Sequence, residues 1–433
     1  MRGWDAERIA AACGGRVVAS GRGGAGPARA VIDSRQAAPD TLFVGLPGAN
    51  VDGGAFAETA LAAGAWGALV AESHAGAGAH GGAVIAAEDP LLALQRLARA
   101  WREHLGCKVI AITGSTGKTS TKDLTRAMAA QQRRVVATSQ NLNTEIGVPL
   151  TILGAPEDTE VLVLELAMRG AGQIAELTEI CRPDVGVIVN IGPVHLEQLG
   201  SLEGIAAAKA ELVAGLAPGA VAVLPAGEPL LDPHRRSDLT TVTFGPGGEV
   251  CELPDGLRIP QTSAHMQTNA LAALAACRAI GIEPAGTVAV ELSAMRGQRH
   301  TLTGGVVVID DCYNANPMSM RAALDDLAVS APGRRVAVLG DMLELGPGEE
   351  EFHRALGEQA DAAGVGLLIT AGPRAALAAE RFAGDAVRAA DAREAADRAA
   401  ELVRDGDTVL VKASRGVGLE TVVARLRERR GDG

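Results

Sequence analysis

Residues 108–122 limit the possible folds more than any other stretch, because they read Lys-Val-Ile-Ala-Ile-Thr-Gly-Ser-Thr-Gly-Lys-Thr-Ser-Thr-Lys. A short apolar run leads into a glycine turn, and Lys118 and Thr119 open a helix-forming stretch that reaches residue 130. A buried strand, a tight loop and a helix in this order form a phosphate cradle, with backbone N–H groups facing the anion. Lys118 then offers a cation to the terminal phosphates and Thr119 a hydroxyl to Mg²⁺. The stretch predicts a nucleoside triphosphate as ligand.

The loop departs from the usual pattern of phosphate loops at one position. The pattern G-x-x-x-x-G-K-[ST] asks for glycine at position 112, where this chain has Ile112. A surface loop before a lysine is the alternative interpretation, but the strand and helix on either side favour a compact phosphate loop. The residues expected to contact ATP there are Gly114, Ser115, Thr116, Gly117, Lys118, Thr119 and Ser120.

Composition narrows the class of protein. A chain of 433 residues exceeds what one core usually organises, so two or three domains are expected. The net charge of −12 argues against a nucleic-acid partner. The six cysteines include no C-x-x-C pair, and no run of 18 apolar residues occurs. We therefore expect reduced thiols, no membrane insertion and a cytoplasmic location.

Apolar runs alternate with helical patterns, which predicts α/β units with mostly parallel sheets. The first unit contains strand candidates at 29–32, 41–45, 68–71 and 83–86, glycine- and alanine-rich loops at 21–28 and 75–82, and a connecting helix at 91–104. The second contains strands at 134–138, 160–165, 185–191 and 220–224, and helices at 171–181, 205–216 and 266–279. The third, dinucleotide-fold-like, contains strands at 306–310, 335–339, 366–370 and 408–412, and helices at 319–327, 349–363, 373–382 and 390–403. The expected domains are residues 1–103, 104–303 and 304–433.

Polar residues follow several of the predicted strands of the second unit. Glu165 ends one strand, at the edge where doubly wound sheets bind ligands, and is a candidate Mg²⁺ ligand. His195 follows the next strand, and Lys209 lies in the helix after it. A solvated histidine and a surface lysine are the alternatives for these two. The segment 139–150 reads as a rigid loop whose Asn141, Asn143 and Thr144 suit hydrogen bonding to a polar ligand.

The third unit repeats this arrangement at two strand ends. The sequence Asp-Asp-Cys-Tyr-Asn-Ala-Asn-Pro follows one strand at 310–317, and Val-Lys-Ala-Ser-Arg-Gly ends another at 411–416. Polar turns are the alternative interpretation of both segments.

Together these stretches resemble the Mur ligase family of ATP-dependent amide-forming enzymes, and the resemblance covers nearly the whole chain. The stretches that carry it are 33–35 (Asp-Ser-Arg), 41–46, 52–56, 113–119, 141–149, 195–197 (His-Leu-Glu), 264–270, 311–317, 340–346 (Gly-Asp-Met-Leu-Glu-Leu-Gly) and 411–415. The segments at 311–317 and 340–346 are typical of the branch of the family that adds D-alanyl-D-alanine.

The resemblance implies a role for each candidate residue. It implies a UDP-binding first domain with contacts from Ser34 and Arg35, a central ATPase domain, and a C-terminal Rossmann-like domain. The implied catalytic residues are Lys118, Glu165, His195 and Lys209. Thr119 and Glu165 would hold one Mg²⁺, and His195 and a carbamylated Lys209 a second. Further ATP contacts are Asn269, Arg299 and Asp311, and substrate contacts are Asn141, Asn143, Thr144, Asn314, Asn316, Lys412, Ser414 and Arg415.

The reaction implied by the resemblance joins D-alanyl-D-alanine to UDP-N-acetylmuramoyl-tripeptide through an acyl phosphate, as the last cytoplasmic step of peptidoglycan precursor synthesis. The resemblance further implies a monomer, and domain closure about a hinge at 301–305. The alternatives are the family's third-residue ligase, a folate polyglutamylating enzyme and a nucleotide switch. The last domain lacks the Asp-Asn-Pro-Arg motif of the first alternative, and the chain lacks the guanine-reading motif of the last. Whether the tripeptide ends in lysine or diaminopimelate stays open.

Overall fold

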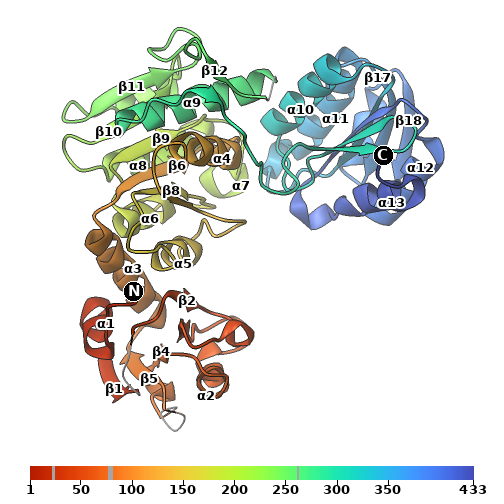
Figure 1. Cartoon of the computed structure of the whole chain (residues 1–433). Coiled ribbons are helices and arrows are strands. Elements are labelled where there is room, and N and C mark those ends of the chain that lie inside the picture. The colour runs from red at the N-terminus through yellow and green to blue at the C-terminus, as the bar shows by residue number, and fades with distance from the viewer. Residues whose placement is uncertain (22–24, 77–80, 261–262) are drawn as a thin grey trace.

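The structure, a computed structural model, describes residues 1–21, 25–76, 81–260 and 263–433. The loops expected at 21–28 and 75–82 fall partly outside these residues. Three α/β units follow one another along the chain, each built on its own main sheet (Figure 1). The sheets are mostly parallel, which confirms the α/β class expected from the alternating pattern.

The first unit is built on a five-stranded sheet in the order β1-β5-β4-β3-β2. Its strands are β1 (Arg16–Ser20), β2 (Arg29–Val31), β3 (Thr41–Val44), β4 (Gly67–Ala71) and β5 (Ala83–Ala87), with helices α1 (Ala6–Cys13) and α2 (Ala57–Ala62) and short 3-10 turns η1 (Ser34–Gln36), η2 (Gly53–Phe56) and η3 (Glu72–His74). The four expected strands are confirmed. Strand β1, antiparallel to β5 at the edge, was not predicted: its apolar run is only three residues long, and none of its side chains is fully buried.

The central unit is a six-stranded parallel sheet in the order β11-β10-β9-β6-β8-β7. Its strands are β6 (Lys108–Thr113), β7 (Val135–Ala137), β8 (Val161–Glu165), β9 (Val185–Ile188), β10 (Val221–Pro225) and β11 (Thr240–Phe244), and its helices are α4 (Lys118–Ala129), α5 (Gly147–Leu153), α6 (Gln173–Cys181), α7 (Leu196–Leu199), α8 (Leu202–Ala214) and α9 (Ala264–Ala279). The unit also carries the turn η5 (Pro229–His234) and the two-stranded sheet of β12 (Leu257–Arg258) and β13 (Gly286–Thr287).

Strand β6 lies between β8 and β9, so the carboxyl ends of the three strands meet at one sheet edge. Side chains of β6 alternate between two cores: Ile110 and Ile112 pack with α4 and α9, while Val109 and Ala111 pack in the core on the other face. The segment 139–150, expected as a loop throughout, becomes helical at Gly147, where α5 begins.

The third unit is a six-stranded sheet in the order β14-β15-β19-β16-β17-β18. Its elements are β14 (Gln298–Leu302), β15 (Val306–Asp310), α10 (Pro317–Ser330), β16 (Arg335–Gly340), η6 (Gly346–Gly348), α11 (Glu349–Ala362), β17 (Val365–Ala371), η7 (Ala375–Glu380), β18 (Asp385–Ala389), α12 (Ala392–Leu402), β19 (Thr408–Lys412), η8 (Arg415–Val417) and α13 (Glu420–Arg430). The helix expected at 373–382 is the 3-10 turn η7.

Strand β14 belongs to the third sheet, where it pairs antiparallel with β15. The expected domain boundary at residue 304 would separate these two paired strands. The expected hinge at 301–305 is wrong, because these residues form the β14–β15 hairpin, which turns at Gly304 and Gly305. We propose instead that the boundary and any hinge lie in residues 288–297, which connect β13 to β14.

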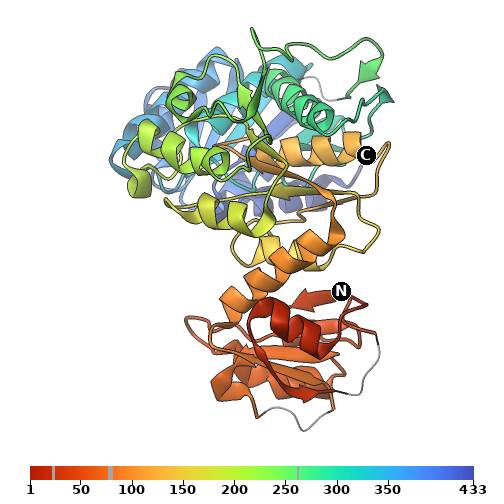
Figure 2. The same ribbon diagram turned by 90° about the vertical axis from the view of Figure 1, so that its left-hand side faces the viewer.

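Helix α3 (Pro90–Leu105) links the first two units into one body (Figures 1 and 2). Its apolar face shares one continuous core with residues of both units, among them Leu42 of β3 and Val109 of β6. Trp101 of α3 packs edge-on against Trp4 with ring centroids 5.4 Å apart. The third unit instead has two cores of its own. In the described part of the chain, no helix is both long and apolar enough to cross a membrane.

Candidate active site

The phosphate loop has the strand, turn and helix that its sequence predicts. It leaves β6 after Thr113 and enters α4 at Lys118, with Gly117 at a left-handed φ of 77°. A Cβ at Gly117 would come within 2.6 Å of the Asn269 side chain, so glycine is required for conformation and for space. No side chain caps α4, which leaves the N–H groups of its first turn for an anion.

Asn190, just beyond β9, holds the phosphate loop in place through its side chain. Its Oδ1 accepts hydrogen bonds from the Ser115 and Thr116 amides at 3.1 and 2.9 Å, and its Nδ2 donates to the Thr116 carbonyl at 3.1 Å. These two amides are therefore engaged inside the protein, which leaves the phosphate-facing N–H groups at the start of α4.

Lys118 contacts the loop that it follows. Its Nζ donates to the carbonyls of Gly114 at 2.8 Å and Ser115 at 3.4 Å, and no ion pair involves it among the described residues. Burial lowers the pKa of Lys118; Glu165 opposes this effect and Arg296 adds to it. An ammonium group without a paired carboxylate, beside a helix N-terminus, suits a phosphate group.

Glu165 and Thr119 lie at the same edge of the sheet. The Glu165 side chain is 1% exposed, and its Oε1 accepts from Asn143 Nδ2 at 2.9 Å. Its Oε2 is buried without a hydrogen-bond partner in the described structure. Burying a carboxylate oxygen that accepts no hydrogen bond costs free energy unless a cation binds to it. Glu165 and the Thr119 hydroxyl therefore fit Mg²⁺, which commonly takes one or two protein oxygens together with phosphates. No cluster of three or more His, Cys, Asp or Glu residues suited to a metal occurs among the described residues.

His195 and Lys209 differ in their surroundings. His195 Nδ1 lies 2.7 Å from Oε2 of Glu344, which belongs to the third unit. Burial lowers the pKa of His195, and Glu344 partly offsets the effect. Lys209, on α8, is 2% exposed and has no hydrogen-bond or ion-pair partner among the described residues. Burial lowers the pKa of Lys209 well below its usual value, and Lys118 adds to the effect. The surface interpretation of Lys209 is therefore wrong.

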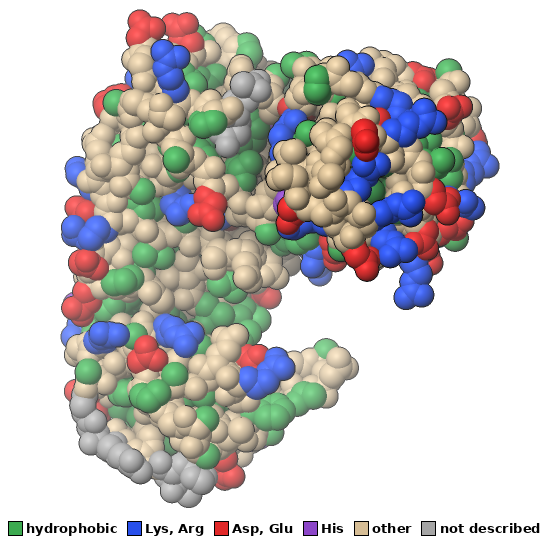
Figure 3. Space-filling view, turned by 45° about the vertical axis from the view of Figure 1, so that its right-hand side comes forward, with side chains coloured by type: hydrophobic (Ala, Val, Ile, Leu, Met, Phe, Trp, Pro, Cys, Tyr) green, Lys and Arg blue, Asp and Glu red, His purple; other side chains and the backbone are tan. Residues whose placement is uncertain are grey.

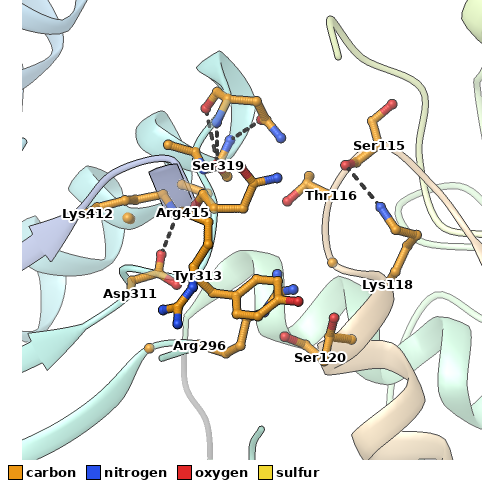
Figure 4. A pocket seen from close by; sticks show the side chains of 18 of the residues that line it. Ser115, Thr116, Lys118, Ser120, Arg296, Asp311, Tyr313, Ser319, Lys412 and Arg415 are labelled. Carbon is orange, nitrogen blue, oxygen red and sulfur yellow. Dashed lines mark hydrogen bonds and ion pairs between the residues drawn. The ribbon is translucent and has the colours of Figure 1, made fainter. Parts of the chain in front are cut away.

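The third unit presents a second lysine from the end of a strand. Lys412 ends β19 and is 2% exposed; its Nζ donates to Asp311 Oδ2 at 2.6 Å and to the Asn314 carbonyl at 2.9 Å. Figure 4 shows this group facing the phosphate loop that carries Lys118 and Ser115 across open space. Ser414 accepts a hydrogen bond from the Leu343 amide at 3.0 Å.

Two arginines come from the segment that enters the third unit. The Arg296 guanidinium lies 3.9 Å from the ring centre of Tyr313, and Figure 4 shows this pair between the two sides of the site. Arg299 donates to Asp326 at 2.8 Å and to Ser330 at 2.7 Å. In this conformation Arg299 is therefore engaged within its own unit.

Asn316 has a clear structural task. It caps α10: its Oδ1 accepts from the Ser319 amide at 2.9 Å, and Ser319 Oγ accepts from the Asn316 amide at 3.0 Å. This reciprocal cap was not predicted from the sequence.

One cavity of about 1270 Å³ lies between the central and third units. The expected site residues that line it are Ser115, Thr116, Gly117, Lys118, Thr119, Ser120, Asn141, Asn143, Thr144, Glu165, His195, Asn269, Arg299, Asp311, Asn314, Asn316, Lys412, Ser414 and Arg415. Within the described structure, Gly114 and Lys209 lie behind the lining, and Ser34 and Arg35 lie in the first unit. Figure 3 shows the surface hollowed between the first unit and the third.

Of the two expected UDP contacts, Ser34 is half-buried and Arg35 is exposed. Arg35 donates from Nη2 to Asp33 Oδ2 at 2.7 Å, and its side chain is 88% exposed. Hydrogen bonding to Arg35 lowers the pKa of Asp33 to about 2. An exposed ion pair of this kind contributes little stability, so a phosphate group can replace the carboxylate.

Sequence reasoning missed several lining or supporting residues. Asn190 carries a usable signal, since it follows a buried strand at the edge where the phosphate loop ends. Glu344 lies in the segment 340–346 that carries the resemblance, although no role was assigned to it. Arg296 and Asp326 line the cavity and carry no such signal.

Comparison with known proteins agrees with this geometry. Residues 112–277 match the Mur ligase middle domain, and residues 295–415 match the family described as Mur ligase, glutamate ligase domain. The UDP-N-acetylmuramoyl-tripeptide–D-alanyl-D-alanine ligase of Bacillus subtilis is 37% identical, and the match covers 92% of each chain. The enzyme of that name from Escherichia coli is 33% identical, over 92% of this chain and 93% of its own.

Solved structures give the same result. MurF from Acinetobacter baumannii superposes with a TM-score of 0.88 at 29% identity, covering 98% of this chain and 99% of its own. MurF from Thermotoga maritima in complex with ADP superposes at 0.82, also at 29% identity, covering 93% and 97%. The phosphate loop, the three sheets and these matches along nearly the whole chain lead to one conclusion: the chain belongs to the Mur ligase family.

Proposed function

We propose that this protein joins D-alanyl-D-alanine to UDP-N-acetylmuramoyl-tripeptide at the expense of ATP, as the names of its relatives in Bacillus subtilis and Escherichia coli say of those enzymes. One observation carries the proposal. An uncapped phosphate loop and a group of polar residues from the third unit face each other across a single cavity of about 1270 Å³. This volume exceeds that of an ordinary ligand pocket, as a site for two reactants requires.

ATP would bind with its phosphates at the N-terminus of α4. Gly114 to Ser120 supply the loop, and the Lys118 ammonium moves from the loop carbonyls to the terminal phosphates. Asn269, Arg299 and Asp311 would hold the rest of the nucleotide. The complex of the Thermotoga maritima relative with ADP supports an adenine nucleotide as ligand.

Two Mg²⁺ ions are proposed, one on Thr119 and Glu165 and one on His195 and Lys209. The unpartnered buried oxygen of Glu165 supports the first site. Bound Mg²⁺ neutralises phosphate charge and orients the phosphate that is transferred. Thr119 and Glu165 would hold the ion with their oxygens.

Lys209 would serve the second site as a carbamate. Its amine is buried, has no acceptor in the described structure and has a lowered pKa, so the neutral form that adds CO₂ is favoured. Addition of CO₂ to the neutral Nζ with loss of one proton gives a carbamate, so that, counting the proton already lost from the ammonium form, a repelling cation becomes an oxygen ligand. A carbon-13 bicarbonate spectrum checks this: a carbamate signal that disappears in Lys209→Ala is expected, and a free amine in the wild type contradicts it.

The chemistry proceeds in two steps. The tripeptide carboxylate attacks the γ-phosphate of ATP, with Lys118 holding the transferred phosphate, and ADP leaves. The amine of D-alanyl-D-alanine, having lost a proton, then attacks the acyl carbon, and phosphate leaves as the amide forms. Lys118, Glu165, His195 and Lys209 are the proposed catalytic residues.

Binding of the two peptides is assigned to both sides of the cavity. The proposed contacts are Asn141, Asn143 and Thr144 of the central unit and Asn314, Asn316, Lys412, Ser414 and Arg415 of the third unit. Ser34 and Arg35 would bind the UDP group, which makes residues 1–103 the UDP-binding domain. Every proposed group comes from one chain, so we propose that the enzyme acts as a monomer.

Phosphate release in the presence of ATP and UDP-N-acetylmuramoyl-tripeptide tests the proposal. Phosphate release should depend on D-alanyl-D-alanine and should not be supported by single amino acids, glutamate included. Lysine- and diaminopimelate-containing tripeptides, assayed in parallel, identify the third residue. Release that is independent of the dipeptide would falsify the assignment.

A further inference from the structure

The segment 340–346, to which the proposed function gives no role, carries Glu344 into the cavity. Oε2 of Glu344 lies 2.7 Å from Nδ1 of His195, a residue 149 positions away that belongs to the central unit. The pair therefore joins two units at the site itself. The Glu344 side chain is 42% exposed and that of His195 is 23% exposed.

The loop that carries Glu344 is held in place by hydrogen bonds. The Met342 amide donates to Nε2 of the buried His353 at 2.9 Å, and the Leu343 amide donates to Ser414 Oγ at 3.0 Å. Glu344 itself has a left-handed φ of 63°, which is uncommon for a residue with a side chain. A glutamate held in this backbone conformation is presented in one direction, unlike an ordinary surface carboxylate.

The partner residue is equally constrained. His195 has a left-handed φ of 52°, and its carbonyl accepts from the amides of Gln198 and Leu199 in the first turn of α7. The two loops touch at backbone level, since a Cβ on Gly346 would lie 3.5 Å from the Glu197 backbone. The His195–Glu344 contact is thus part of a packed junction between the units.

The chemistry of the two groups determines which of them donates the hydrogen bond. A carboxylate can only accept, so the Nδ1 of His195 must carry the proton that it shares with Glu344. This tautomer leaves the lone pair on Nε2. Histidines that bind metals usually donate their other ring N–H to a carboxylate, which fixes the ring and its tautomer. Lys118 places positive charge near this ring, and the carboxylate of Glu344 counters it.

We propose that Glu344 is a positioning residue for His195: it accepts the Nδ1 proton and frees Nε2 for the metal ion, so that the metal site is complete only when the third unit is docked. This inference rests on the proposed function in assigning His195 to a metal ion. It gives the third unit a part in building a site whose other residues all belong to the central unit.

Mn²⁺ binding to the full chain, measured by electron paramagnetic resonance with a non-hydrolysable ATP analogue, tests this role. Glu344→Ala should weaken Mn²⁺ affinity by about 10- to 100-fold, the range measured for outer partners of metal-binding histidines. Glu344→Gln keeps a side-chain oxygen that can accept from Nδ1, and its affinity should stay within about threefold of the wild type. Glu197→Gln removes an exposed carboxylate from the same junction and is the matched control.

A double-mutant cycle separates positioning from a general loss of charge. In a His195→Ala background, Glu344→Ala should have no further effect on Mn²⁺ affinity. Equal affinity of Glu344→Ala and wild type overturns the inference, as does an equal loss in Glu344→Ala and Glu344→Gln. If wild type shows dipeptide-dependent phosphate release while Glu344→Ala binds Mn²⁺ normally, this inference alone fails. If Glu344→Ala binds Mn²⁺ weakly but wild type shows no such release, the proposed function fails.

Discussion

The two sides of the cavity use charge differently. On the central side, Lys118 contacts only backbone carbonyls and Glu165 only an amide side chain. On the third-unit side, Lys412 pairs with Asp311 at 2.6 Å and Arg299 with Asp326 at 2.8 Å. Charges without a partner of opposite sign are ready for ions that arrive with the nucleotide. Charges that are already paired form a surface of fixed shape, proposed above to contact both the nucleotide and the peptide.

The largest expected effect is the loss of the central cation. Lys118→Ala removes the ammonium group proposed to bind the transferred phosphate and should lower kcat for phosphate release by about 10³-fold. Lys108→Ala, which removes an exposed lysine at the start of β6, should leave the rate within about twofold, since its ion pair with Asp184 lies on the surface. Similar rates for the two variants would contradict the assignment of Lys118.

On the third-unit side of the cavity, breaking an ion pair should lower the stability of the fold. Asp311→Ala leaves the buried Lys412 ammonium without its carboxylate and should cost about 3 kcal/mol of local unfolding free energy. Hydrogen exchange of β16 and β19 amides measures this cost. Asp326→Ala breaks the more exposed pair with Arg299 and should cost no more than about 1 kcal/mol. Lys118→Ala should cost none, and a loss equal to that of Asp311→Ala would remove the contrast between the two sides.

A third effect concerns protons. Burial lowers the pKa of Lys118, and a bound phosphate raises it, so ATP binding takes up protons between the two pKa values. ATP affinity should therefore fall as pH rises through the lowered pKa towards the usual lysine value, by up to about tenfold per pH unit. Calorimetry in two buffers of different ionisation heat measures the uptake. Lys118→Arg, which stays protonated, should show none, and equal uptake by both proteins would contradict the prediction.

The smallest effect concerns Asn316. Asn316→Ala removes the cap of α10 and should cost about 1 kcal/mol of stability. Asn316→Asp keeps the cap, so its melting temperature should match the wild type. A fall in kcat/KM for the dipeptide in both variants supports the proposed substrate contact. A fall in Asn316→Ala alone shows that the residue acts through α10.

The central strands of all three main sheets were predicted from the sequence. Of the edge strands, β2 and β7 were predicted, whereas β1, β11, β14 and β18 were not. Strands β6, β8 and β16 are apolar runs buried on both faces, which leaves a clear pattern. Strands β14 and β18 include polar side chains and lie at the sheet edge, where one side needs no partner. Missing β14 also misplaced the expected hinge.

The same division applies to the site. Residues at the ends of neighbouring parallel strands, such as Glu165 and Thr119, were expected to meet because one sheet edge brings them together. The His195–Glu344 and Arg296–Tyr313 contacts depend on tertiary packing, and no spacing in the sequence encodes them. The burial of Lys209 is likewise set by how α8 packs against the sheet.

The continuous core around α3 has a consequence for substrate length. Because that helix fuses the first two units, the span between Arg35 and the phosphate loop is set by the fold and not by the ligand. On the proposed assignment, the enzyme holds its substrate at the nucleotide end and reacts with it at the peptide end. The fixed span then selects substrates by length. A precursor that lacks residues of its peptide binds by its UDP group, but its terminal carboxylate does not reach Lys118.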